Sequence, residues 1–307
     1  MTAVAAWARR AWDHDLAWRF RHSPLAILAA ALTLACVGGA VLAPWVAPHN
    51  PFDSASLNLS DGFTPPAWLA GGRATYLLGT DDQGRDVLST ILYGARISLG
   101  VGLAAVLLSA LAGVALGLAA GYFGGRLDAF LMRVADIQLS FPAILVALLI
   151  DGLARAALPR DRHDAIAVYV LVLAIAASGW VQYARTVRGS TLVEKGRDYV
   201  LAARVIGRSP LAIMVHHVLP NVMGPVLVIA TIHVATAIIT EATLSFLGVG
   251  VPPTQPSLGT LVRIGNDFLL SGEWWIAVFP GAALVVLVLA VNLLGDWLRD
   301  ALNPRLR

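Results

Sequence analysis

The sequence has little charge, almost no lysine and a single cysteine. Only 13% of its 307 residues are charged, whereas 58% are hydrophobic and the mean hydropathy is +0.73. A soluble domain carries roughly 25% charged residues. The composition therefore excludes an ordinary soluble protein and indicates a membrane protein. The net charge of +3 is small and does not suggest a nucleic-acid-binding protein.

These scarcities also exclude several kinds of site. The only lysine, Lys195, lies in "VEKGRD", whereas a phosphate-binding loop requires Gly-Lys-Ser/Thr. We therefore expect no cofactor in this chain, and ATP hydrolysis must come from another one. Cys36 lies in an apolar run and has no partner for an internal disulfide, so we expect it to pack. The adjacent His216 and His217 point about 100° apart on a helix, and no His-Glu-x-x-His sequence occurs. We expect no metal site.

Six apolar segments are long enough to cross a bilayer, which takes about 20 helical residues. They predict an all-α, polytopic membrane protein with six transmembrane helices. The first segment follows a basic lead of 23 residues and is longer than the ~7–15-residue core of a signal peptide, so we expect it to be retained. The third is the weakest, because Asp151 and Arg155 lie in it. The segments cover approximately 25–43, 97–122, 137–158, 165–183, 222–249 and 276–294.

Basic residues are unevenly shared between the two sets of connections. Both termini and the connections on their side hold 15 of the 22 Lys and Arg residues, and the opposite set holds 7. Since cytoplasmic loops carry the excess of Lys and Arg, we expect both termini in the cytoplasm. The expected parts are a cytoplasmic N-terminal segment (1–23), a first transmembrane helix (24–47), a periplasmic segment (48–96), a five-helix core (97–296) with a cytoplasmic loop (185–221), and a cytoplasmic tail (297–307).

The periplasmic segment ends in a helix signal. Thr80 followed by Gln83 fits a capping box, and two aspartates lie in the first turn, where a helix favours negative charge. We expect a short helix over 81–93, ended by Gly94, with an apolar face suited to the membrane interface. The acidic cluster does not fit a calcium loop, because Leu92 stands where the bidentate glutamate belongs.

The second apolar segment carries Gly113, Gly117 and Gly121 at a spacing of four residues. Glycines at this spacing form a flat stripe that lets another helix approach closely. The pattern favours packing within the chain, and contact with a second membrane subunit is the alternative.

A charged stretch, "GRDYVLAARVIGRSPLAIMVHHVLPN" (196–221), separates the fourth and fifth segments. Its apolar residues recur at helical spacing and predict two short amphipathic helices on the cytoplasmic side, with Gly207 in the turn between them. Ser209 is a natural N-cap and Pro210 suits the first helical position. Pro220 is expected to end the second helix. Such helices dock in the groove of a partner or lie on lipid.

This stretch resembles the cytoplasmic loop of membrane permease subunits in binding-protein-dependent ABC importers. That motif runs Glu-Ala-Ala, three residues, Gly, then an Ile, then His-x-Leu-Pro. The resemblance implies a coupling helix that lies in a groove of the ATP-hydrolysing subunit. Leu201 stands in place of the family's glutamate, which puts a charge contact with that subunit in doubt. The residues with an implied coupling role, including the cap serine, are Ala202, Ala203, Gly207, Ser209, Ile213, His217, Leu219 and Pro220.

Two further stretches, "LGTDDQGRDVLSTILYGARISLGVGL" and "EATLSFLGVGVPPTQPSLGTL", are similar to the second permease subunit of the peptide and nickel importer branch. With the loop motif they cover most of the chain from Leu78 onward. The resemblance implies a type I ABC importer transmembrane fold in a bacterial inner membrane. It implies as partners a homologous second permease subunit, two ABC ATPase subunits that bind ATP and Mg, an extracytoplasmic substrate-binding protein, membrane lipid, and a dipeptide or oligopeptide. Nickel chelates and glutathione-like molecules remain open as substrates.

The resemblance also suggests which parts face the binding protein. We expect these to be the helix around 81–93 and the loop over 252–273. The first of them presents Asp81, Asp82, Arg85 and Asp86.

The fifth segment carries the candidates for a transport path. Glu241 lies about 28 Å along it, near the outer mouth, and His233 about 16 Å along it, near mid-membrane. Glu241, with Ser245 beside it, either lines the path and meets the cationic end of a peptide, or makes a structural hydrogen bond to its own loop or to a sister subunit. For His233 a bond to a neighbouring helix is favoured over a proton relay, because no acid stands one turn away.

Two other classes of protein fit the sequence less well. An ion-coupled secondary transporter needs partnered acids at mid-membrane, and none stands there. A membrane-embedded hydrolase needs a paired nucleophile and base, and Ser140 or Ser245 near His233 is a weak constellation.

Overall fold

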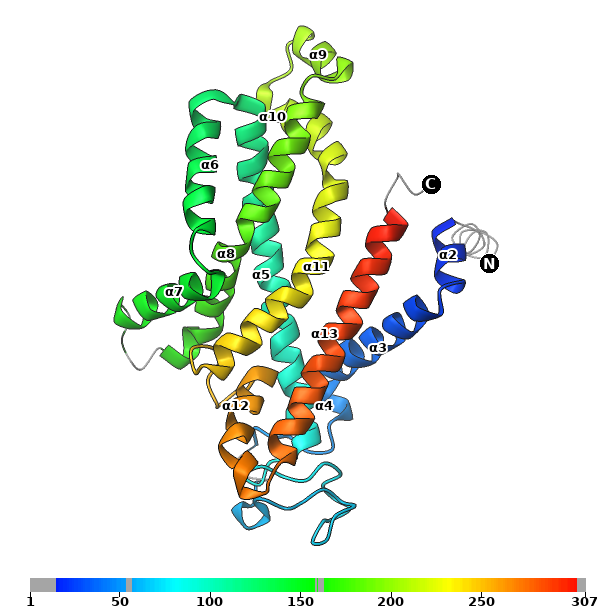
Figure 1. Ribbon diagram of the computed structural model, residues 1–307, viewed down its shortest axis with the longest axis vertical. Coiled ribbons are helices and arrows are strands. Elements are labelled where there is room, and N and C mark those ends of the chain that lie inside the picture. The colour runs from blue at the N-terminus through cyan, green and yellow to red at the C-terminus, as the bar shows by residue number, and fades with distance from the viewer. Residues whose placement is uncertain (1–14, 54–56, 158, 160–162, 303–307) are drawn as a thin grey trace.

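The computed structural model describes residues 15–53, 57–157, 159 and 163–302 (Figure 1). Within these ranges every regular element is helical, and the one β contact is an isolated bridge between Thr80 and Asp86. The predicted all-α class is confirmed. The elements are α2 (Asp15–Arg21), α3 (Pro24–Val41), α4 (Ala43–Val46), η1 (Leu59–Asp61), α5 (Val87–Phe123), α6 (Gly125–Leu139), α7 (Ala143–Ala157), α8 (His163–Glu194), α9 (Asp198–Val205), α10 (Pro210–Ile213), η3 (Met214–Val218), α11 (Leu219–Phe246), α12 (Leu258–Phe268), η4 (Leu269–Ser271) and α13 (Trp275–Leu302).

The molecule is elongated, with α5, α8 and α11 running side by side along it (Figure 1). Helices α9 and α10 lie at one end, which we call the α9 end. Helix α12 and the irregular segment between α4 and α5 lie at the other, which we call the α12 end. The described helices are therefore arranged so that the charged stretch before α11 and the polar stretch before α5 are far apart.

Five of the described helices are long and apolar enough to span a membrane, and a sixth span forms if a bent pair is counted as one. That pair is α6 and α7, which meet at 95°. The bend falls in the third predicted segment. It was expected to be one helix over 137–158, and this expectation was wrong, because Pro142 cannot donate a backbone hydrogen bond and the α-helix ends before it at Leu139. Gln138 holds the bend against α8 by accepting a hydrogen bond from the Trp180 indole at 2.8 Å.

The glycine stripe of α5 lies against α8. A Cβ atom at Gly117 would lie 2.5 Å from the carbonyl oxygen of Ala184, and one at Gly121 would lie 2.7 Å from Cβ of Thr191. A Cβ at Gly113 would overlap the backbone of Trp180 in the same way. Real Cβ atoms do not approach this closely, so the two helices reach their observed contact only because these positions are glycine.

The start of α5 differs from the prediction. No separate helix covers 81–93, because α5 runs without a break from Val87 to Phe123. The expected capping box is not formed. Asp86 is the N-cap instead, and its carboxylate accepts a hydrogen bond from the backbone N–H of Ser89 at 2.9 Å.

A tight turn occupies the residues that were expected to be helical. The carboxylate of Asp81 accepts hydrogen bonds from the backbone N–H groups of Gln83 and Arg85, each at 2.9 Å. Gly84 takes a φ of +74°, which glycine adopts at little cost. Gly94, expected to end the helix, lies inside α5 and faces α12, where a Cβ would come within 3.3 Å of the Leu258 nitrogen.

Pro220 does not end a helix either. The chain is helical from Pro210 to Phe246, and a π-helical turn, η3, directly precedes α11. A proline ring clashes with the carbonyl four residues earlier in a regular α-helix. A π turn spaces the backbone differently, and a proline in the first turn of the following helix is tolerated. The second predicted helix of the loop is thus continuous with the fifth span.

Candidate functional site

The segment between α8 and α11, which we call the α9 segment (195–221), forms a helix, a turn and a second helical start. Helix α9 ends at Val205, and Gly207 turns the chain with a φ of +81°. Ser209 then caps α10, because its hydroxyl accepts a hydrogen bond from the Ala212 N–H at 3.3 Å. The predicted helix, glycine turn and serine cap are confirmed.

This segment has an inner and an outer apolar face. Val200 and Ile213 are buried against the ends of α5, α8 and α11. Val205 and Ile206, at the tip, are 88% and 78% exposed, and Leu211 is 67% exposed. Exposed apolar side chains at the tip of a polar loop are costly in water and mark a contact surface.

The residues with an implied coupling role are divided between the two faces. Ala202, Gly207, Ser209 and Pro220 are exposed, Ala203 and Ile213 are buried, and His217 and Leu219 lie between. The side chain of Leu201, at the family's glutamate position, is 45% exposed. In the described part of the chain, no three His, Cys, Asp or Glu side chains gather in a way that could hold a metal ion.

Polar contacts attach the α9 segment to the helix bundle. The ammonium of Lys195 donates to the carbonyl of Gly121 at 2.8 Å, in the last turn of α5, where a helix favours positive charge. The guanidinium of Arg204 lies over the ring of Tyr122, 5.1 Å from its centre. Tyr199 donates to Glu194 and accepts from the Asn221 side chain at 3.1 Å, which joins α8, α9 and α11. Partial burial, and then the Glu194 carboxylate, raises the pKa of Tyr199.

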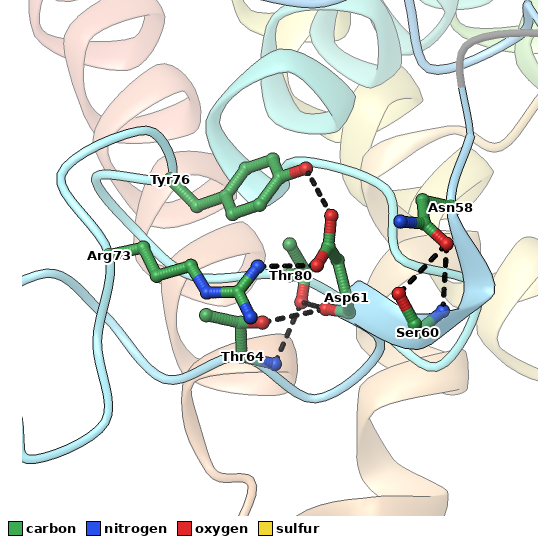
Figure 2. Close-up of polar contacts among 7 residues, drawn as sticks. All are labelled: Asn58, Ser60, Asp61, Thr64, Arg73, Tyr76 and Thr80. Carbon is green, nitrogen blue, oxygen red and sulfur yellow. Dashed lines mark hydrogen bonds and ion pairs between the residues drawn. The ribbon is translucent and has the colours of Figure 1, made fainter.

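At the α12 end, a second set of polar contacts holds the irregular segment together (Figure 2). The carboxylate of Asp61 accepts hydrogen bonds from Arg73 at 2.5 Å and from the Tyr76 hydroxyl at 3.1 Å. Its carbonyl accepts from the hydroxyls of Thr64, at 2.8 Å, and Thr80, at 2.5 Å. Burial, followed by the hydrogen bond to Asp61, raises the pKa of Tyr76. One aspartate, at the end of the short helix η1, thus organises the irregular segment that follows it.

The charged residues expected to face a binding protein are mostly inside this segment. Asp81 and Arg85 form an ion pair at 2.6 Å with side chains only 3% and 4% exposed. Asp86 is 2% exposed and caps α5. The expectation that these three side chains are presented to a partner was wrong, because each one satisfies backbone or side-chain groups of its own chain. Asp82 is partly exposed, and it remains a candidate for the outer surface.

Glu241 lies near the end of α11 and is fully buried. It accepts hydrogen bonds from Ser98 of α5 and from Ser245 of its own helix, each at 2.7 Å. Ser245 in turn accepts from the backbone N–H of Val251, in the loop that follows. This geometry fits the structural alternative for Glu241, a bond to its own loop, and adds a link to α5.

His233 is 9% exposed and lies between α8 and α11. Its Nδ1 is 3.0 Å from the hydroxyl of Tyr183. Its ring occupies the space above Gly179, where a Cβ would overlap Cε1. The predicted bond to a neighbouring helix is therefore present, and the only carboxyl on α11, Glu241, lies two turns further along the helix.

Comparison with known proteins places these features in one family. Residues 113–307 match the family described as binding-protein-dependent transport system inner membrane component. Residues 9–66 match the family described as N-terminal TM domain of oligopeptide transport permease C. The chain belongs to the binding-protein-dependent inner membrane permeases. The family is one of membrane transport subunits, and its members are multi-pass proteins of the inner membrane.

Curated relatives of this permease are similar over almost their whole length. The di/tripeptide transport system permease protein DppC of Pseudomonas aeruginosa is 40% identical, over 94% of this chain and 90% of its own. The oligopeptide transport system permease protein OppC of Bacillus subtilis is 36% identical, over 95% of this chain and 90% of its own.

A solved structure gives the fold of the permease. The MetNI methionine ABC transporter in an inward facing conformation contains a chain with a TM-score of 0.53, at 18% identity, covering 70% of this permease and 96% of that chain. At this identity the likeness concerns the fold alone, and it confirms the expected ABC importer permease fold.

Two contacts in this permease could not be found from sequence. Ser98 binds Glu241 across 143 positions, and Lys195 binds Gly121 across 74. The single lysine and the only acid of the fifth apolar segment, Glu241, were visible in the sequence as unusual residues. Their partners are a common serine and a backbone carbonyl, which carry no sequence signal.

Proposed function

We propose that this chain is a permease subunit of an importer that moves dipeptides or oligopeptides across the bacterial inner membrane. The observation that carries the proposal is the family match over 113–307, joined by relatives at 36–42% identity whose names are peptide permeases. The peptide, rather than a nickel chelate or a glutathione-like molecule, is chosen because the DppC of Pseudomonas aeruginosa and the OppC of Bacillus subtilis are peptide permeases by name.

The motor of this importer lies in other subunits. The chain lacks the Gly-Lys-Ser/Thr of a phosphate-binding loop, so the subunit itself is not an enzyme in this proposal. Two ATPase subunits draw together on binding ATP, and a groove of one of them holds the α9 segment. The exposed apolar tip at Val205 and Ile206 supports this contact, since an apolar helix end gains by entering a groove. Leu201 then makes an apolar contact where relatives of this family carry a charge.

A second permease subunit completes the path. An apolar groove of about 990 Å³ lies between α5 and α11, reaching the α9 segment at Leu211 and the end of α13 at Leu298. Its lining is made of aliphatic side chains with the single hydroxyl of Thr231. The second subunit, with lipid, covers this groove, and alternating access comes from the rocking of the two subunits against each other.

The extracytoplasmic binding protein delivers its peptide to the α12 end. Buried ion pairs and caps, rather than exposed charges, give that end its shape. The binding protein contacts exposed side chains at this end, which include Gln83 before α5 and the fully exposed Leu270 in η4.

The proposal is tested by separating assembly from transport at the α9 segment. A double variant, Val205→Asp with Ile206→Asp, places two charges at the apolar tip without touching the buried face. In cells that lack their own copy of the gene, we expect this variant to reach the membrane, to lose the ATPase subunits on purification in detergent, and to reduce uptake of a labelled dipeptide at least tenfold, as expected for charges forced into an apolar contact.

The matched control is Leu270→Asp, which puts a charge on an equally exposed leucine at the opposite end. It should retain the ATPases. Unchanged uptake and unchanged ATPase retention in the double variant would contradict the proposed coupling surface. A wild-type protein that takes up nickel or glutathione but no dipeptide would contradict the peptide as substrate.

A further inference from the structure

Near the α12 end, Glu241, Ser98 and Ser245 form a buried hydrogen-bonded cluster among apolar helices, which we call the Glu241 joint. Glu241 of α11 is 0% exposed, and the hydroxyl donors Ser98 and Ser245 are 0% and 1% exposed. A buried carboxyl group that loses its hydrogen-bond donors is strongly destabilised. Any movement at this place must therefore keep Glu241 and its donors together.

Ser98 joins three helices with one hydroxyl group. It lies on α5 and donates to the Glu241 carboxyl of α11 at 2.7 Å. The same oxygen accepts a hydrogen bond at 3.2 Å from the backbone N–H of Leu258, the first residue of α12. The N-terminus of α12 is thereby aimed at the carboxyl group, and Ser257, its N-cap, completes the turn by accepting from Thr260 N–H at 3.3 Å.

Close backbone contacts fix α12 in this position. A Cβ at Gly259 would overlap the backbone of Ala242, one helical position from Glu241. A Cβ at Gly94 would lie 3.0 Å from the Leu261 side chain, and one at Gly265 would overlap Ala277 of α13. Helix α12 therefore packs backbone to backbone against α11 at Gly259 and against α13 at Gly265, and against α5 at Gly94, so a shift of α11 changes the contacts at the N-terminus of α12.

The other end of α11 continues into the α9 segment. The chain is helical over the 37 residues from Pro210 to Phe246, a path of about 55 Å at ~1.5 Å per residue. Glu241 is therefore on one uninterrupted helical stretch with Pro210, which follows the proposed ATPase contact at Ile206 by four residues across the Gly207 turn (Figure 1). A displacement of the α9 segment reaches α12 through α11, provided that the joint holds.

We propose that Ser98 and Glu241 are positioning residues that transmit the movement of α11 to α12, and so link the ATP-driven step at one end to opening of the path at the other. This inference rests on the proposed function. It assigns Glu241 a mechanical role and gives Ser98, which carries no sequence signal, an equal part in it.

The test compares two buried serines of α5. Ser98→Ala removes the hydroxyl that joins α5, α11 and α12. Ser109→Ala is the matched control, because Ser109 is also 0% exposed and also donates one bond to another helix, the carbonyl of Ala176 in α8 at 3.1 Å. The full complex with its ATPases, second permease and binding protein is reconstituted in liposomes. ATP hydrolysis and uptake of tritium-labelled Ala-Ala are then measured together.

We expect Ser98→Ala to keep binding-protein-stimulated ATP hydrolysis within about twofold while dipeptide moved per ATP falls about fivefold, the effect of losing one hydrogen bond to a buried carboxyl. Ser109→Ala should leave the ratio unchanged. A purely structural loss would lower hydrolysis and uptake together and leave their ratio alone. That result, or an unchanged ratio in Ser98→Ala, or an equal fall in both variants, would overturn the proposal.

Two further outcomes are distinguishable. If Ser98→Ala does not assemble, Glu241→Gln, which keeps the volume and one acceptor oxygen, gives the same measurement. A lowered ratio then supports the joint and an unchanged ratio overturns it. A wild-type complex that shows no dipeptide-stimulated hydrolysis contradicts the proposed function itself, before any variant is compared, and the inference falls with it.

Discussion

At the scale of single residues, Asp82 is a carboxyl group at the α12 end whose surroundings favour its protonated form. Its Oδ1 is buried and has no hydrogen-bond partner among the described residues. Burial, followed by the neighbouring charge of Asp81, raises the pKa of Asp82, and Arg85 only partly offsets this. The folded protein therefore holds the proton more tightly than the unfolded chain does.

This direction gives a prediction with a defined sign. Ionisation of Asp82 lowers the free energy of unfolding as the pH rises from about 4, the ordinary carboxyl value, through the raised folded pKa. Asp82→Asn removes that ionisation. We expect the variant to be more stable than the wild type at neutral pH, and the difference to vanish in acid, where the wild-type carboxyl is protonated. Thermal unfolding in detergent across this range measures it.

The control for this prediction is Asp267→Asn, on the exposed side of α12. It separates the loss of a partly buried carboxyl group from the general effect of removing one negative charge at this end of the molecule. An Asp82→Asn variant that is less stable than the wild type at neutral pH would show that the ionised carboxylate has a stabilising partner, opposite to the direction given by its burial.

Lys195 shows the limit of sequence reasoning at this scale. Because the only lysine lies outside any Gly-Lys-Ser/Thr sequence, the sequence alone was enough to exclude a phosphate-binding loop. Its actual contact, the carbonyl of Gly121 at the end of α5, requires the fold that brings α5 and α8 together. The identity of an unusual residue is readable from sequence, whereas its partner depends on packing that sequence spacing does not encode.

At the scale of helices, the contact of α5 with α8 depends on its glycines. Gly117→Ala adds a Cβ at 2.5 Å from the carbonyl of Ala184, so α8 must move away. We expect a loss of about 1–3 kcal/mol in the free energy of unfolding, the usual effect of overpacking. Melting temperature in detergent measures it.

Gly100→Ala is the control on the same helix, because nothing lies within 4 Å of a Cβ there. It should be neutral or stabilising by up to about 1 kcal/mol, since alanine favours helix over glycine. Equal melting temperatures for the two variants would contradict a role for the stripe in packing.

Helix existence was readable from the sequence, and helix ends were not. Apolar length predicted the spans and Gly207 with Ser209 predicted the turn after α9. The sequence predicted a capping box at Thr80, but Asp86 is the N-cap. The reason is that the Asp81 carboxylate accepts hydrogen bonds from the backbone N–H groups of Gln83 and Arg85, which holds 81–85 in a turn. Pro220 was predicted to end a helix because proline clashes with the preceding turn of a regular α-helix. The π turn that precedes it spaces the backbone differently, so the helix continues.

At the scale of the whole molecule, the connections rich in basic residues and those poor in them lie at opposite ends. The connections with 15 of the 22 basic residues include the α9 segment, and the set with 7 includes the α12 end. These two ends lie at opposite extremes of the molecule (Figure 1). From the excess of Lys and Arg expected on the cytoplasmic side, we propose that the α9 end faces the cytoplasm and the α12 end faces outward.

That orientation is tested by labelling single cysteines. Cys36 is the only native cysteine, so a Cys36→Ser chain is the background for Ile206→Cys, 78% exposed at the α9 end, and Leu270→Cys, 99% exposed at the α12 end. With a membrane-impermeant maleimide we expect Leu270→Cys to react in spheroplasts and Ile206→Cys to react only in inside-out vesicles made from cells that lack the ATPase subunits. Leu107→Cys, 60% exposed but in the middle of α5, should stay unlabelled in both because lipid or a second subunit covers it. The reverse pattern for positions 206 and 270 would place the α9 segment outside the cell, where no ATP-hydrolysing subunit could reach it.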